Sequence, residues 1–155
     1  MNSIVIYATR SGNTRMVATA IADELRKHGE VHILSAEEAR AAMPDQVDLL
    51  VVGGPTEGHG ATEAIVRLLD RFGPQTLDGV AVAAFDTRLR WPRVLSGSAA
   101  DIIARRLEAA GARVVVPAES FLVSRKPELE AGELERAPLW AASVAAAVGT
   151  VAVPA

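Results

Sequence analysis

Polar side chains that could bind a ligand gather first in a short loop, residues 9–14. The loop reads Thr9-Arg10-Ser11-Gly12-Asn13-Thr14 and directly follows an apolar run. Hydroxyl and amide groups at the start of a helix can donate to an anion, and the helix dipole favours the same negative charge. Gly12 lets the backbone approach closely, and Ser and Thr donate to phosphate oxygens without a lysine. We therefore predict a phosphate site in this loop.

A simpler interpretation of residues 9–14 stays open, in which they only cap a helix and make a tight turn. Two other phosphate-binding loops are excluded, because the chain has no G-x-G-x-x-G after this apolar run and no G-x-x-x-x-G-K-[ST].

Two more loops carry side chains suited to a ligand. Residues 53–60 read Gly-Gly-Pro-Thr-Glu-Gly-His-Gly, and residues 85–93 contain Asp86, Trp91 and three arginines. An indole in a loop can stack on a flat ligand, or it can pack beneath its own loop. The arginines, Arg88, Arg90 and Arg93, could attract an anionic ligand or an acidic partner, and could equally be solvated or paired with carboxylates.

Alternating strands and helices must position these loops. Apolar runs predict buried strands over residues 4–8, 31–34, 47–52, 80–85 and 114–116, the last resuming at 121–123. Apolar residues at helical spacing predict helices over residues 14–28, 36–43, 62–72, 98–110 and 133–148, with residues 86–97 as a loop. Pro44 should end the second helix, and Ser98 should cap the fourth.

This alternation predicts right-handed crossovers and a parallel α/β sheet that is covered by helices on both faces. Ligands of such sheets bind beyond the carboxyl ends of the strands. The three polar loops, residues 9–14, 53–61 and 86–97, all follow strands and should therefore meet at one edge.

On these residues the sequence resembles the flavodoxin family over nearly its whole length. The family's loop for the flavin phosphate has the pattern [TS]-x-[TS]-G-x-T, which Thr9, Ser11, Gly12 and Thr14 match. The resemblance implies flavin mononucleotide (FMN) as cofactor. It also implies a flavodoxin-like, doubly wound, five-stranded parallel sheet in three α/β/α layers, with strand order 2-1-3-4-5.

The resemblance also implies roles for the other two loops. Glu57 stands where the family often has a tryptophan stacked on the flavin, so His59 or an aliphatic contact could replace that ring. Gly58 or Gly60 could allow the peptide flip by which the family forms a hydrogen bond to N5 of the reduced flavin. Asp86 and Trp91 match a family spacing in which the later residue, usually Tyr, stacks on the outer face. The predicted cofactor-binding residues are Thr9, Arg10, Ser11, Gly12, Asn13, Thr14, Pro55, Thr56, Glu57, Gly58, His59, Gly60, Phe85, Asp86, Thr87, Arg88 and Trp91.

Composition excludes several other classes of function. The 155 residues fit one domain, predicted as residues 1–149 with a frayed tail over 150–155. A formal charge of -3 gives no general attraction to nucleic acid or to an anionic membrane. The chain has no cysteine, which excludes disulfides, thiolate metal sites and a cysteine nucleophile. With no basic leader and no apolar stretch of bilayer length, the expected location is the cytoplasm.

We therefore expect an FMN-binding electron-transfer protein that serves a redox partner protein or a small acceptor. No residue must act as a nucleophile, and only His59 and Asp86 are candidates for handling protons near the ring. Two alternatives remain open: an NAD(P)H-dependent FMN reductase acting on a quinone or similar acceptor, which the arginines favour, and a cofactor-free regulatory module.

Overall fold

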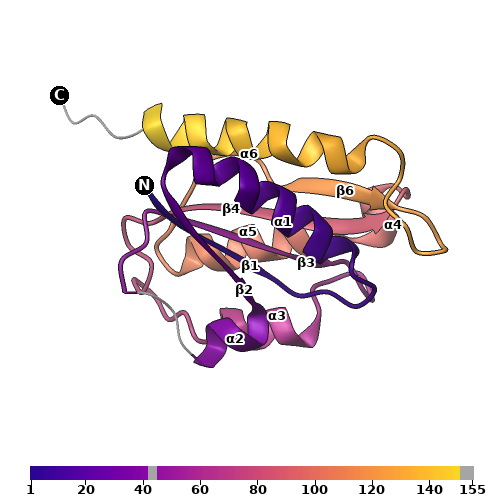
Figure 1. The fold of residues 1–155 in the computed structure, drawn as a ribbon. Helices are drawn as coiled ribbons and strands as arrows, with labels where there is room; N and C mark the ends of the chain where they lie inside the picture. The colour runs from indigo at the N-terminus through magenta and orange to yellow at the C-terminus, as the bar shows by residue number, and fades with distance from the viewer. Residues whose placement is uncertain (42–44, 151–155) are drawn as a thin grey trace.

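The computed structural model describes residues 1–41 and 45–150, in which six strands form one parallel sheet (Figure 1). The strands are β1 (Asn2–Tyr7), β2 (Glu30–Ser35), β3 (Leu49–Pro55), β4 (Ala81–Leu89), β5 (Arg113–Val114) and β6 (Glu119–Val123). The helices are α1 (Asn13–Leu25), the 3-10 turn η1 (Arg26–His28), α2 (Ala36–Ala41), α3 (Glu63–Leu69), α4 (Arg93–Ser96), α5 (Ala99–Ala109) and α6 (Glu133–Thr150).

The order of the strands confirms the predicted topology. The sheet runs β2-β1-β3-β4-β5, and β6 also pairs with β4. The central strands are apolar on both faces, with Ile4, Val5, Val51 and Val52 almost without exposed surface. That burial explains why their sequences read as continuous apolar runs.

The fifth position of the sheet is filled by two pieces of strand, as the sequence predicts. Ala81 pairs with Arg113, whereas Phe85 pairs with Glu119. The edge strand therefore has two residues more than β4 between these pairings. The extra residues interrupt the ladder between β5 and β6, and β6 resumes beside the carboxyl end of β4.

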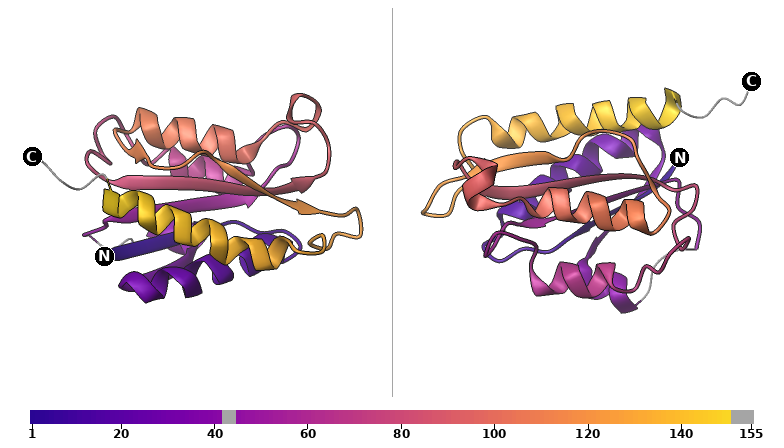
Figure 2. Two further views of the ribbon diagram at one scale, coloured as in Figure 1. Left: turned by 90° about the horizontal axis from the view of Figure 1, so that it is seen from above. Right: turned by 180° about the vertical axis from the view of Figure 1, so that it is seen from behind.

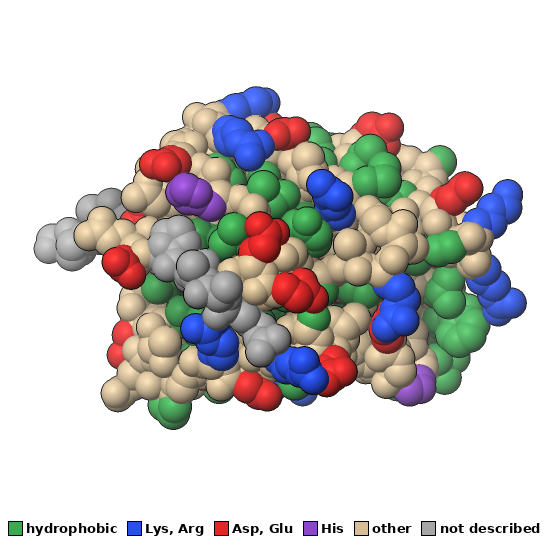
Figure 3. Space-filling view, turned by 60° about the horizontal axis from the view of Figure 1, so that its bottom comes forward, with side chains coloured by type: hydrophobic (Ala, Val, Ile, Leu, Met, Phe, Trp, Pro, Cys, Tyr) green, Lys and Arg blue, Asp and Glu red, His purple; other side chains and the backbone are tan. Residues whose placement is uncertain are grey.

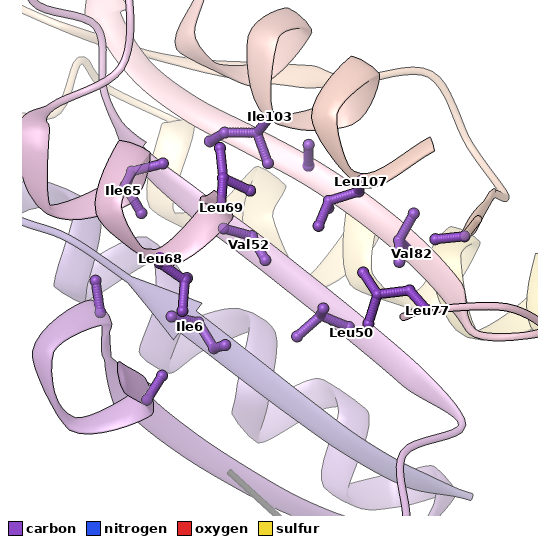
Figure 4. Close-up of a cluster of buried hydrophobic side chains, with 14 of the residues drawn as sticks. Ile6, Leu50, Val52, Ile65, Leu68, Leu69, Leu77, Val82, Ile103 and Leu107 are labelled. Carbon is purple, nitrogen blue, oxygen red and sulfur yellow. The ribbon is translucent and has the colours of Figure 1, made fainter. Parts of the chain in front are cut away.

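Helices cover both faces of the sheet and produce two hydrophobic cores (Figure 2). One core lies beneath α1 and α6 and contains Val17, Ile21, Phe85 and Trp140. The other lies beneath α2, α3 and α5, with the leucine and isoleucine side chains shown in Figure 4. These five helices each contribute one apolar stripe to a three-layer structure, whereas α4 buries none of its residues.

Two boundaries differ from the prediction at the end of β4. The strand continues to Leu89, beyond the predicted end at residue 85, because its last residues pair with β6 and with Pro55 of β3. The predicted loop over residues 86–97 also contains the short helix α4. Both changes reduce the irregular part of this loop to a few residues around Trp91.

The other helix ends lie within three residues of the prediction where they can be seen; α3, for example, ends at Leu69, before the predicted end at residue 72. The Ser98 hydroxyl accepts a hydrogen bond of 3.3 Å from the Asp101 N–H, which confirms the predicted cap of α5. The predicted end of the second helix at Pro44 lies outside the described residues. Of the predicted tail, residue 150 belongs to α6 and residues 151–155 lie outside the described part. No helix within the described ranges is long and apolar enough to cross a membrane.

Candidate flavin site at the carboxyl ends of the strands

A cavity of about 440 Å³ opens at the carboxyl edge of the sheet, among the loops that follow β1, β3, β4 and β6. Its size suits a single organic ligand. The lining residues are Arg10, Ser11, Asn13, Thr14, Pro55, Thr56, Glu57, Thr87, Arg88, Leu89, Trp91, Val123, Ser124, Arg125 and Pro127. The structure thus brings the three predicted loops together, as the topology requires.

The loop after β1 presents donors to this cavity at the start of α1. Gly12 has a φ of 93° and turns the chain into the helix, while its N–H donates to the Thr9 hydroxyl over 2.9 Å. Thr9 and Gly12 therefore shape the turn, and neither lines the cavity. Ser11 and Asn13 face the cavity, and the first turn of α1 contains no acidic residue. This arrangement favours an anion at the helix N-terminus.

Thr14 and Thr87 connect that helix start to β4. Their hydroxyl oxygens are 2.8 Å apart, and both side chains are buried. Both residues also line the cavity. The hydrogen bond fixes the first turn of α1 relative to the strand that carries the third loop.

The loop after β3 closes in a tight turn from Glu57 to Gly60. The backbone N–H of each of these residues donates to the carbonyl of the other, over 2.8 and 2.9 Å. Gly58 and His59 between them have φ values of 52° and 69°, which suits glycine and strains histidine. Gly97 packs directly against this turn, because a Cβ on Gly97 would lie 2.1 Å from the His59 carbonyl oxygen.

The turn lies beside a smaller hollow of about 220 Å³, which Gly58 and His59 line. This hollow and the main cavity share Thr56, Arg88, Leu89 and Trp91 as walls. The two spaces are therefore contiguous around the third loop. Gly60 closes the turn and lines neither space.

Asp86 and Phe85 lie beneath the cavity, and neither lines it. Asp86 is fully buried, and its Oδ2 accepts hydrogen bonds from the Ser98 hydroxyl, the Thr56 hydroxyl and the Ala100 N–H. The carboxylate thus joins the second loop to the start of α5. Its Oδ1 has no hydrogen-bond partner among the described residues. This placement makes Asp86 a support of the cavity wall.

Two tryptophans have different environments. Trp91 lines the cavity with 46% of its surface exposed, and the Arg125 guanidinium lies 5.7 Å from its ring centroid. Trp140 is buried and packs in the core, with ring centroids 6.0 Å from Phe85 and 6.1 Å from Phe121. Trp91 is therefore the aromatic side chain available to a flat ligand.

Two of the three arginines after Asp86 are paired with carboxylates, one of the alternatives that the sequence left open. Arg90 donates to Glu130 from Nε over 3.1 and 3.3 Å and from Nη2 over 2.8 Å, and these hydrogen bonds raise the pKa of Arg90 above its ordinary value. Arg93 is 3.5 Å from Asp101. Arg88 donates instead to the Trp91 carbonyl over 2.6 Å and to the Ser120 hydroxyl over 3.0 Å. It therefore holds the loop that carries the indole.

Sequence reasoning missed the loop after β6, of which Ser124, Arg125 and Pro127 line the cavity. This loop folds back as a hairpin, with the Ser124 N–H donating to the Glu128 carbonyl over 2.8 Å. The Asn13 side-chain amide donates to the Pro127 carbonyl over 3.3 Å and joins this hairpin to the first loop. The signal available in the sequence was its position after a strand of the same parallel sheet.

The fold and the cavity define a class of α/β protein that binds a phosphate-bearing ligand at the carboxyl ends of its strands. The family model for flavodoxin matches residues 5–141. The chain belongs to the flavodoxin family. No match is found among curated proteins.

Solved structures share this fold. Oxidised flavodoxin 1 from Bacillus cereus is 24% identical, with a TM-score of 0.74 over 93% of this chain and 97% of that one. The flavodoxin WrbA-like protein from Agrobacterium tumefaciens is 19% identical, with a TM-score of 0.72 over 96% and 98%. Rubredoxin oxygen:oxidoreductase from Desulfovibrio gigas is 17% identical, with a TM-score of 0.74 over 98% of this chain and 37% of that one.

The cofactor of this chain is FMN, as membership of the family indicates. The residues present fit it. The Ser11 hydroxyl offers a donor to a phosphate at the start of α1, and Trp91 offers a flat face to an aromatic ring. One cavity of suitable size thus has a side suited to the phosphate and a side suited to the ring.

Proposed function

We propose that the protein carries electrons on bound FMN between redox partners. The observation that carries this proposal is the composition of the cavity wall. Among the described residues that line it, the only carboxylate is Glu57, which is paired with Arg10, and none is a histidine. The bound flavin supplies the electron-transfer chemistry, while the protein binds it and sets its surroundings.

The exposed edge of Trp91 supports the same proposal. The indole and the exposed Leu95 of α4 line the smaller hollow together, and Val94 of the same helix is also exposed. In Figure 3, basic side chains gather beside a hydrophobic patch at the right end of the molecule, toward which the strand arrows point in Figure 1. Such a surface suits brief contact with a partner that has acidic groups around an apolar centre.

A second candidate is an NAD(P)H-dependent reductase that uses the same flavin. Arg125 favours it, because this guanidinium is exposed beside Trp91 and makes no ion pair within the described part of the chain. An exposed arginine at the mouth of the cavity could bind a phosphate of the nucleotide. Family membership does not support the cofactor-free module.

Mixing the FMN-loaded protein with NADPH alone separates the two candidates. For an electron carrier, the flavin absorbance should persist for many minutes, and bleach only after a separate flavin reductase is added. Rapid bleaching by NADPH, followed by turnover with a quinone, would contradict the electron-carrier proposal and favour the reductase.

A further inference from the structure

The cavity wall on the β1 side has an ion pair where the other wall has an aromatic ring. Arg10 follows β1, Glu57 follows β3, and both line the cavity. The Arg10 Nη2 donates to the Glu57 Oε2 over 2.8 Å, and its Nε contacts Oε1. Since β1 and β3 precede β4 and β6 in the order of the sheet, the pair and Trp91 approach the cavity from opposite sides.

Two parallel contacts of this kind place the guanidinium and the carboxylate in one plane. The result is a flat surface with no net charge, of roughly the extent of an aromatic side chain. A guanidinium stacks readily on an aromatic face, and its partner carboxylate fixes its orientation.

The backbone at both ends of the pair is held in place. Glu57 opens the hydrogen-bonded turn that ends at Gly60, and the N–H of the preceding Thr56 donates to the Thr87 carbonyl over 2.9 Å. Arg10 lies in the turn that Thr9 closes on Gly12. The Arg10 side chain is 75% exposed and the Glu57 side chain 33% exposed, and both line the cavity, so the pair can meet a ligand there.

We propose that the Arg10–Glu57 ion pair is the contact surface for the flavin ring on the β1 side of the cavity. It takes the place of an aromatic side chain, opposite Trp91. The competing role for Arg10 is contact with the phosphate, because it belongs to the phosphate loop. In the structure, however, two of its nitrogens already bond to Glu57.

Titrations of the full chain, stripped of flavin, with FMN and with riboflavin distinguish these roles. Arg10→Gln and Glu57→Gln should each raise the Kd of both flavins by the same factor, about two- to fivefold, the range for an exposed ion pair. The double variant should bind no more weakly than either single variant, because the two side chains act as one unit. Arg106→Gln is the matched control, since it breaks the exposed Arg106–Asp70 pair, which does not line the cavity, and should leave both Kd values unchanged.

A second variant tests the surface directly. Glu57→Trp should tighten the binding of both flavins, and adding Arg10→Gln to it should cost nothing further. The proposal is overturned if Arg10→Gln weakens FMN alone, which would place Arg10 at the phosphate. It is equally overturned if Glu57→Gln leaves both affinities unchanged. These are binding measurements, so their outcome is independent of whether the protein carries electrons or reduces a substrate.

Discussion

The Ser11 hydroxyl has a donor to spare at the cavity wall. Its oxygen accepts a hydrogen bond of 3.2 Å from the Asn13 amide, which leaves its own proton free for a phosphate oxygen. Ser11→Ala should weaken FMN binding about tenfold, on the order of 1.5 kcal/mol for a hydrogen bond to a charged group. The affinity for riboflavin, which lacks the phosphate, should not change.

Fluorescence titration with the two flavins measures this difference. Thr19→Ala is the control, because the Thr19 hydroxyl lies on the exposed side of α1 and donates to the Arg15 carbonyl. An equal loss for FMN and riboflavin would mean that Ser11 does not contact the phosphate.

Trp91 should contribute the larger part of the binding energy of the ring. Trp91→Ala should weaken both flavins by about 1–3 kcal/mol, the scale of stacking between an aromatic side chain and a base. Binding of flavin should also quench that part of the tryptophan fluorescence that Trp91→Phe removes. Val94→Ala, which shortens an apolar side chain of α4 that is 91% exposed, serves as control. Unchanged affinity in Trp91→Ala would place the ring elsewhere.

Among individual residues, the sequence predicted those whose contacts are local in the chain. Ser11, Gly12 and Thr14 lie within one turn, so their pattern alone indicates a helix start that can bind an anion. Arg125 and Pro127 were missed because they reach the cavity through the pairing of β6 with β4, which no local pattern reveals. The burial of Asp86 was missed for the same reason, since its partners come from the start of α5 and from Thr56.

Among the helices, α6 is held to β6 by a carboxylate whose charge matters for stability. Glu133 accepts hydrogen bonds from Arg136 over 2.9 Å and from the Leu122 N–H over 2.7 Å. The hydrogen bond from Arg136, followed by that from Leu122, lowers the pKa of Glu133 below its ordinary value. A carboxyl group with a lowered pKa stabilises the folded state above its unfolded pKa, and this contribution is lost as the pH falls through the folded value.

Glu133→Gln should therefore lower the free energy of unfolding at pH 7 by about 1–3 kcal/mol. The difference from the native protein should shrink as the pH falls below about 4.3, the ordinary value for glutamate. Urea unfolding at several pH values measures this difference in the free energy of unfolding. Glu135→Gln on the same helix is the control. A difference that is constant down to the most acidic pH would show that charge is not the cause.

The strands and helices were predicted well where a local pattern of apolar residues marks them. Central strands with both faces covered by helices appear in the sequence as continuous apolar runs. Amphipathic helices appear as apolar residues at helical spacing. The extension of β4 to Leu89 was not predicted, because residues 86–88 are polar and the pairing of Thr87 and Arg88 with Phe121 and Leu122 is non-local. Sequence pattern ends a strand where the apolar run ends, whereas the sheet continues as long as a neighbour pairs with it.

The molecule as a whole carries a formal charge of -3, yet its cavity mouth presents arginine. The reduced holoprotein should therefore pass electrons to an anionic acceptor such as ferricyanide faster in dilute buffer than at physiological ionic strength. We expect a difference of about two- to fivefold, because the Debye length is only about 8 Å at physiological salt.

Stopped-flow rates over a range of salt concentrations test this expectation. Arg125→Gln should flatten the salt dependence, whereas Arg105→Gln on α5 should not. A rate that rises with salt would mean that the net negative charge of the molecule governs encounter.

Gly97 has a consequence for how this protein tolerates sequence change. In a library that replaces every position in turn, with colonies sorted by the yellow colour of bound flavin, residues of the cavity wall should stand out first. Gly97 is not among them, but its φ of 71° and its contact with the His59 carbonyl leave no room for a side chain. Any replacement must displace the turn that begins at Glu57, so colonies altered at residue 97 should turn pale although no atom facing the flavin has been exchanged.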